Sequence, residues 1–301
     1  MLRSFWMLSA SFFFALMAAC NKLAAADGLG SYELVFYRQV FSMAAIAVWV
    51  FATGRTLKTK HWTGHLKRSL LGNLSLVIWF WSIARLPLGT AMTLNYTNPL
   101  FMAAIVAALA VWRGEKLEWV LLGCVAAGFC GVALVLHPET GSSDLGVGLI
   151  GLSSGFFAAV TQFQIRQLAV LKEPVWRIVF YFSLTGTIAG LIGHWAVEGP
   201  LTPLTAANAL PLFGMGLCGL LAQLSLTRAW GGSSLLLTSS LQYSAIVFAA
   251  VIGFLAFGEP LSLLEGAGIA LIIAAALAAT LETKRAEARR AEALKAGRNG
   301  A

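Results

Sequence analysis

Charged residues are scarce in this sequence. Asp, Glu, Lys and Arg make up 11% of the 301 residues and 58% of the chain is hydrophobic, whereas a soluble globular domain carries about 25% charged residues. The scarcity excludes water as the main solvent of the chain. The apolar runs are continuous and of helix length, which excludes the alternating pattern of a membrane β-barrel. The sequence therefore predicts a membrane protein built from helices.

Residues that build disulfides, metal sites and catalytic centres are also few. The four cysteines all fall inside apolar runs without ligand-like spacing, so neither a disulfide framework nor a zinc site is indicated. The four histidines are dispersed, and the pair at helical spacing, His61 and His65, lacks a third ligand or a glutamate base. We therefore expect no metal, no cofactor and no enzymatic activity.

The basic residues that are present give a net charge of +8. They lie almost entirely in short connectors and in the tail, so they are typical of topology signals rather than of a nucleic-acid interface. With the N-terminus inside, every Lys and Arg falls on the cytoplasmic side except Lys22, Arg38 and Arg85. Acidic residues such as Asp27 and Glu259 collect at the opposite face. Both termini are predicted to be cytoplasmic.

Ten apolar segments are long enough to cross a bilayer, and the connectors between them are too short for a soluble domain. The first follows Arg3 as a signal peptide would, but it runs to Ala26 without a cleavage region and is predicted to be a span. The predicted spans are 5–26, 33–53, 67–85, 88–112, 118–137, 146–168, 174–196, 206–230, 233–257 and 262–281.

A shift of 144 residues places the N-terminal half of the chain over the C-terminal half. The shift pairs Lys22 with Arg166 and Glu115 with Glu259. Because each copy holds five spans, an odd number, the second copy must enter the membrane from the opposite side. The predicted fold is an all-α polytopic membrane protein of ten transmembrane helices in two inverted five-helix repeats. The first repeat covers 1–138, the second covers 146–283, and a basic cytoplasmic tail follows at 284–301.

Several short motifs make the chain similar to one known family. They are Asn21-Lys22-Leu23, Phe36-Tyr37-Arg38, the stretch RLPLGTAMTLNYTNPLF that ends at Phe101, Gly114-Glu115-Lys116-Leu117, and Gly258-Glu259-Pro260-Leu261. With these motifs and its two halves, the chain resembles the drug/metabolite transporter superfamily, specifically its EamA-type members. The resemblance implies a multi-pass carrier in the cell membrane that moves a small molecule through a central cavity by alternating access. One departure is that the second half has Gln242-Tyr243 where the first has Asn98-Pro99.

Polar side chains inside lipid-level segments are costly, so they are the first candidates for a transport pathway. The amide side chains could contact substrate or could bond helices together, and the aromatic ones could stack on a ligand or merely pack. The resemblance adds the second span to the helices that line the cavity. The candidate substrate-binding residues are Tyr37, Arg38, Trp79, Asn95, Tyr96, Asn98, Gln162, Gln223, Gln242 and Tyr243.

Three of the basic residues within the predicted spans could have a role in transport. Lys22 and Arg166 stand at opposite mouths and are candidates for gates or paired charges, the alternative being that they reach the lipid headgroups. Arg38, deeper in its span, should pair with a carboxylate, either that of Glu33 or that of a substrate. The second option predicts an anionic or zwitterionic substrate.

The spans carry no Asp or Glu near their middle; the nearest is Glu265, in the opening turn of the last span. Proton-coupled carriers usually keep such a group, so a facilitator or exchanger of a small polar or zwitterionic metabolite is favoured. A proton-coupled drug or metabolite exporter is the alternative, and a channel is less favoured because no charged ring is seen. The partners expected are the substrate and the lipid bilayer, and faces of small residues leave a homodimer open.

Overall fold

The structure is a computed structural model that describes residues 6–112, 119–135, 142–231, 238 and 241–299. The described residues form helices joined by short connectors and contain no strand. In chain order the helices are α1 (Trp6–Ala26), α2 (Ser31–Ala52), α3 (Trp62–Ile83), α4 (Leu88–Asn95), α5 (Asn98–Trp112), α6 (Trp119–Val135), α7 (Ser142–Val170), α8 (Val175–Gly193), the short π-helix η1 (His194–Glu198), α9 (Ala206–Trp230), α11 (Ser244–Phe257) and α12 (Leu263–Asn299).

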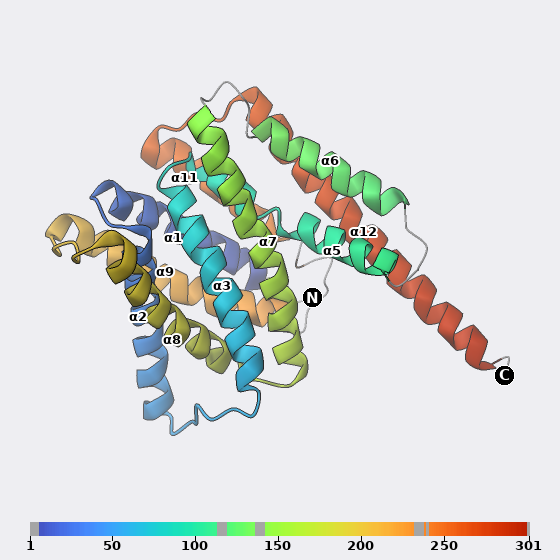
Figure 1. Ribbon diagram of the computed structural model, residues 1–301, viewed down its shortest axis with the longest axis horizontal. Helices are drawn as coiled ribbons and strands as arrows, with labels where there is room; N and C mark the ends of the chain where they lie inside the picture. Colours follow the sequence, from blue (N-terminus) through green and yellow to red (C-terminus); the bar gives the residue numbers. More distant parts are fainter. Residues whose placement is uncertain (1–5, 113–118, 136–141, 232–237, 239–240, 300–301) are drawn as a thin grey trace.

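Seven stretches of the described chain are long and apolar enough to cross a membrane, which confirms a polytopic, all-helical membrane protein. α3 is long enough but is not among them, because polar side chains follow one of its faces. α6 and α11 are apolar but short. The span predicted to start at residue 67 begins earlier, at Trp62. α12 continues past residue 281 as one helix to Asn299, and its C-terminal part projects from the bundle (Figure 1).

The helices pack in pairs that join distant parts of the sequence. α1 packs along α9, α3 along α7, α2 along α8, and α6 along α12 (Figure 1). Small side chains allow the close approach, as at Ala10, Ala15 and Ala18 of α1, which are fully buried. Each of these pairs takes one helix from each half of the sequence, so the core lies between the halves rather than within either half.

The span predicted at 88–112 is broken in the middle. α4 ends at Asn95, Tyr96 and Thr97 form a turn, and α5 begins at Asn98. Pro99 has no N–H to continue the helical bonding, but proline is tolerated in the first turn of a helix, which is where it stands in α5. A turn also precedes α11, at Tyr243, although no proline is present there. Both breaks place polar residues, Asn98 and Gln242, at the same level of the bundle.

Two glycines bring α6 and α12 into backbone contact. A Cβ atom added to Gly131 would lie 2.9 Å from the carbonyl oxygen of Gly268, and one added to Gly268 would lie 2.8 Å from that of Gly131. A side chain at either position would therefore force the helices apart. Gly123, on the same helix as Gly131, has open space around an added Cβ.

This contact predicts the effect of a matched pair of substitutions. Gly131→Leu should destabilise the protein by about 2 kcal/mol, since overpacking a tight contact costs about 1–3 kcal/mol. Gly123→Leu should change stability little. Thermal unfolding of the detergent-purified variants measures both, and equal stability of the two variants would contradict the close approach of α6 and α12.

Candidate functional site

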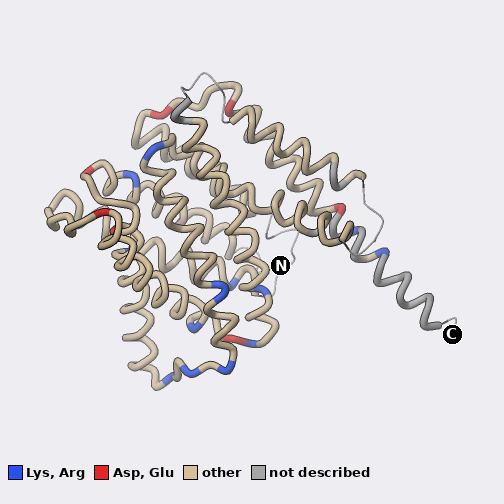
Figure 2. Tube along the Cα trace, in the orientation of Figure 1, with Lys and Arg blue, Asp and Glu red and all other residues tan. Residues whose placement is uncertain are grey.

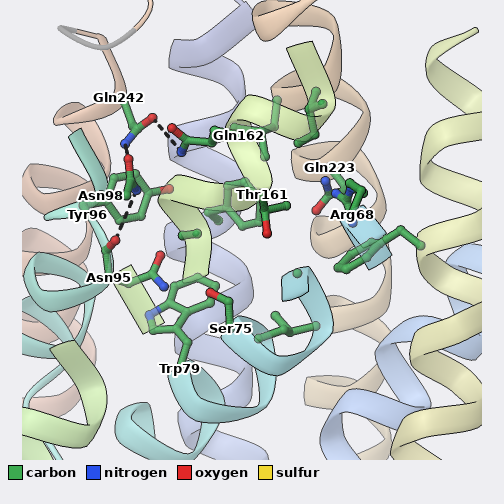
Figure 3. A pocket seen from close by; sticks show the side chains of 17 residues that line it. Arg68, Ser75, Trp79, Asn95, Tyr96, Asn98, Thr161, Gln162, Gln223 and Gln242 are labelled. Atoms are coloured by element: carbon green, nitrogen blue, oxygen red, sulfur yellow. Dashed lines mark hydrogen bonds between the residues drawn. The ribbon is translucent and has the colours of Figure 1, made fainter. Parts of the chain in front are cut away.

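A cavity of about 90 Å³ lies in the middle of the bundle, lined by residues of α1, α3, α4, α7, α8 and α9, by the start of α5 and by the turns that precede α5 and α11. Its apolar walls come from side chains such as Phe14, Leu76 and Phe182. Figure 3 shows the polar and larger aromatic side chains that point into it. They are Arg68, Ser75, Trp79, Asn95, Tyr96, Asn98, Thr161, Gln162, Gln223 and Gln242.

Side-chain amides form a hydrogen-bonded chain along one wall of the cavity (Figure 3). Nε2 of Gln242 donates to Oδ1 of Asn98 at 2.8 Å, and Nε2 of Gln162 donates to Oε1 of Gln242 at 3.4 Å. Asn98 in turn donates to the backbone carbonyl of Asn95 at 3.1 Å, which the helix break leaves available. Asn98 and Gln242 stand 144 residues apart, the shift that relates the two halves of the sequence.

Two buried arginines meet on the other side of the cavity. Arg68 and Arg38 are each 1% exposed, and their guanidinium carbons lie 3.7 Å and 5.4 Å from the centre of the Phe182 ring. Arg38 makes only long contacts, to the carbonyl of Gly219 at 3.4 Å and to Oε1 of Gln223 at 3.5 Å. Nε and Nη1 of both arginines have no hydrogen-bond partner, and no carboxylate of the described residues forms an ion pair with either. The site is therefore positively charged and short of acceptors.

The option that Arg38 pairs with Glu33 is wrong. The Glu33 carboxylate accepts hydrogen bonds from the backbone N–H and the hydroxyl of Thr202, at 2.8 and 2.7 Å. It is thereby held at the end of α2 away from Arg38, which reaches Gln223 on α9 instead. A contact between residues so distant in the sequence cannot be read from local spacing.

The structure brings seven of the ten predicted substrate-binding residues to this cavity. The other three do not line it: Arg38 contacts Gln223, Tyr243 is buried with an unbonded hydroxyl, and Tyr37 is half-buried beside Phe36. The spacing of Asn95 and Asn98 would place them on one face of a continuous helix, but the helix breaks between them. The seven that line the cavity are Trp79, Asn95, Tyr96, Asn98, Gln162, Gln223 and Gln242.

Arg68 is the most important site residue that the sequence pattern did not predict. Its neighbour Lys67 suggests a pair of topology charges at the membrane border, but Lys67 is exposed and Arg68 is buried. A signal is nevertheless present in the sequence. Arg68, Gly72, Ser75 and Trp79 follow helical spacing, so they place a polar stripe on one face of α3 that leads to the cavity.

At one end of the bundle, Lys22 closes a contact between the halves. Its ammonium forms an ion pair with Glu259 and donates to the carbonyl of Leu86 at 2.9 Å. The second carboxylate oxygen of Glu259 accepts from the N–H of Leu88, the first residue of α4, at 2.8 Å. Arg166, the counterpart of Lys22, is exposed, and Glu115 lies outside the described residues.

At the other end, Glu173 joins the connector between α2 and α3 to α8. Its carboxylate accepts from the hydroxyl of Thr59 at 2.5 Å and from Arg177 at 2.9 Å, and Nε2 of the buried His65 lies 3.6 Å away. Burial alone would raise the pKa of the Glu173 carboxyl. The hydrogen bonds from Thr59 and Arg177, with the positive charge of Arg177, outweigh burial and hold this pKa below its ordinary value.

The chain is similar to known proteins in both sequence and structure. Residues 1–137 match the EamA-like transporter family. The pseudopaline exporter CntI of Pseudomonas aeruginosa is 32% identical over 89% of this chain and 92% of its own length. The S-adenosylmethionine uptake transporter of Rickettsia felis is 28% identical over 88% and 87%, and the riboflavin transporter of Vibrio cholerae is 25% identical over 95% of each chain. A crystal structure 17% identical in sequence covers 95% of this chain and 98% of its own, with a TM-score of 0.65, so the two share a fold.

The lowered pKa of Glu173 predicts how its contribution to stability depends on pH. A carboxylate with a depressed folded-state pKa stabilises the protein above its unfolded-state value, about 4.5, and loses that contribution as the pH falls through the folded-state value. Glu173→Gln should therefore unfold at a lower temperature than the wild type at neutral pH, and the gap should close on acidification below about pH 4.5. Thermal melts across pH test this, and a gap that widened in acid would contradict the assignment.

Proposed function

The chain belongs to the EamA-like transporter family, and from that premise we propose that it carries a small, carboxylate-bearing polar metabolite by alternating access between two inverted five-helix halves. The family and its named relatives make the protein a small-metabolite transporter of the drug/metabolite type, a multi-pass protein of the cell membrane and not an enzyme. The family resemblance seen in the sequence motifs is thereby confirmed.

The pattern of helix packing supports two equivalent halves, residues 1–138 and 146–283, with 284–301 as a tail. Exchanging the halves turns the pair α1/α9 into α7/α3 and leaves the pairs α2/α8 and α6/α12 unchanged, and all four pairs are among the most closely packed. Residues related by a two-fold axis can touch each other only near that axis. Asn98 with Gln242 and Arg38 with Phe182 are such pairs, each 144 residues apart. The cavity therefore lies at the proposed axis, where inverted-repeat carriers bind substrate.

Charge placement supports an orientation with both termini in the cytoplasm. Figure 2 shows Lys and Arg gathered at the end of the bundle that holds the connector 53–61, while Asp and Glu lie mainly at the other end. Basic residues near short connectors mark the cytoplasmic side. The contact between Lys22 and Glu259 then closes the outer side, and the contacts of Glu173 close the inner side.

The two buried arginines are the observation from which we infer a substrate with a carboxylate. A guanidinium without a counterion is expensive at membrane depth, so Arg68 and Arg38 need an anion that the described chain does not supply. A substrate carboxylate would accept from the planar donors of Arg68. The amides of Asn98 and Gln242 would bond the polar groups of the substrate, and Trp79 and Phe14 would contact its apolar part.

The size of the cavity supports a carrier that must rearrange to bind its substrate. About 90 Å³ is well below the range of about 300–1,000 Å³ that is usual for small-molecule sites. A substrate of metabolite size therefore requires one half to move against the other. Opening either the Lys22 contact or the Glu173 contact would admit substrate from that side alone, which is the requirement for alternating access.

The lining of the cavity supports a facilitator or exchanger. The cavity lining holds no Asp, Glu or His in the part of the chain that the structure describes. A proton-coupled exporter, the alternative, would need a group there that titrates in the working range. Uptake that follows the substrate gradient with no response to an imposed pH gradient is expected, and a channel would instead show steady ion conductance.

Transport and binding by Arg68→Met test the proposal directly. In proteoliposomes loaded with labelled amino acids, nucleoside derivatives and other carboxylated metabolites, the wild type should exchange at least one compound and should not exchange its carboxamide analogue. Arg68→Met should bind that compound about tenfold to a hundredfold more weakly, since a hydrogen bond to a charged group contributes about 1.5–3 kcal/mol. Its melting temperature without substrate should not fall, because an uncompensated buried charge is removed.

Lys67→Met is the matched control, since Lys67 is the exposed neighbour of Arg68 on the same helix. It should bind and transport as the wild type does. Equal affinity of the wild type for the carboxylate and its carboxamide would overturn the substrate class. A loss of stability in Arg68→Met that accounts for the lost transport would assign Arg68 to structure instead.

A further inference from the structure

A second hollow lies on the outer surface of the bundle at its basic end, apart from the central cavity. It has a volume of about 720 Å³ and forms where α2 and α9 end and where α1 and α8 begin. We call it the tryptophan groove, after Trp6, Trp49 and Trp176, which line it. It shares no lining residue with the central cavity.

The floor of the tryptophan groove is hydrocarbon. Ile46 of α2 and Leu220 and Leu224 of α9 line it, and the rings of Trp49 and Trp176 meet edge to face at 6.0 Å. Trp49 is 42% exposed, although it belongs to the end of a membrane helix. Tryptophan at this position is typical of the boundary between the acyl chains and the headgroups.

The rim of the groove is cationic. The guanidinium of Arg55 lies 4.7 Å from the centre of the Trp49 ring, and that of Arg228 lies 4.8 Å from the centre of the Trp6 ring. Both arginines line the groove and both are exposed. No acidic residue lines it among the described side chains. The nearby Glu173 is already occupied by Thr59 and Arg177.

We propose that the tryptophan groove binds one anionic phospholipid of the cytoplasmic leaflet. Arg55 and Arg228 would hold the phosphodiester and its anionic headgroup, and an acyl chain would lie along Ile46, Leu220 and Leu224. Basic pockets between helices on the cytoplasmic side are suited to such headgroups, and the two cation–π contacts hold the guanidinium groups in place at the interface. A soluble anion would use the rim but not the floor, and a zwitterionic lipid would use the floor but gain little from the rim.

The other end of the bundle offers a built-in comparison. A groove of about 750 Å³ there is lined by Tyr32, Trp81, Arg85 and Glu198 among others. Arg85 corresponds to Arg228 at a shift of 143 residues and also lies over a tryptophan, 4.2 Å from the ring of Trp81. Glu198 lines this groove together with Arg85, so the described lining carries no net charge. Of these two grooves, only the tryptophan groove has a net positive lining among the described residues.

Native mass spectrometry of the full chain in detergent tests the proposal, with phosphatidylglycerol and phosphatidylcholine of identical acyl chains as probes. The wild type should retain one phosphatidylglycerol in preference to phosphatidylcholine. The double variant Arg55→Gln/Arg228→Gln should bind phosphatidylglycerol about thirtyfold more weakly, since each basic residue near an anionic lipid surface contributes about fivefold. Both arginines are exposed, so folding should be unaffected, which the elution volume and melting temperature without lipid verify.

Matched controls separate the groove from general surface charge. Lys58→Gln/Lys60→Gln removes two exposed charges from the same connector, and Arg85→Gln removes the counterpart arginine at the other end. All should bind phosphatidylglycerol as the wild type does. Ile46→Trp, which fills the floor and keeps both arginines, should weaken the lipid but not glycerophosphate.

Three results would overturn the proposal. They are equal retention of the two lipids by the wild type, an equal loss in the Lys58 and Lys60 control, or displacement of the lipid by glycerophosphate at comparable concentration. The last result would make the groove a site for a soluble anion. None of these outcomes depends on transport, so the lipid site and the proposed function stand or fall separately.

Discussion

The hydrogen bond between Gln242 and Asn98 is the interaction on which the rest of the structure depends. Buried amides at membrane depth must find partners within the protein, and these two find each other across the interface of the halves, at 2.8 Å. Each sits beside a break in its helix, at Tyr96 and Thr97 in one half and at Tyr243 in the other. The breaks let both side chains reach the centre, and the packing of α4 on α11 follows from that meeting.

The need of buried polar groups for partners within the protein also applies to the two buried arginines. The amides of Asn98, Gln162 and Gln242 are hydrogen-bonded to one another, but Nε and Nη1 of Arg38 and Arg68 have no acceptor among the described residues. Both guanidinium groups lie near the ring of Phe182, whose π electrons stabilise the positive charges without neutralising them. Under the proposed function, the carboxylate of the substrate would supply the missing acceptors. A bound substrate would thereby stabilise the arrangement in which the two halves pack around it. The central cavity is small because side chains from both halves line it.

Hydropathy is sufficient to predict most of the helices, and the polar residues inside apolar runs are sufficient to predict the members of the amide chain, since both depend on local sequence. Three features cannot be predicted that way. The sequence predicts that Arg68 lies at the membrane border. The first turns of α3, from Trp62, are too polar for hydropathy to show that the helix begins there. The partner of Glu33 is Thr202, set by tertiary packing. The break after Asn95 separates two asparagines whose spacing in the sequence is that of one helical face.

Alternating access requires the two ends of the bundle to open in turn. Spin labels can report this from two exposed pairs: Leu23 with Leu261 beside the Lys22 contact, and Lys58 with Leu171 beside the Glu173 contact. In Lys22→Met the first distance should lengthen while the second stays short, and in Glu173→Gln the second should lengthen while the first stays short. Distances that lengthen together in either variant, or that do not respond at all, would contradict alternating access.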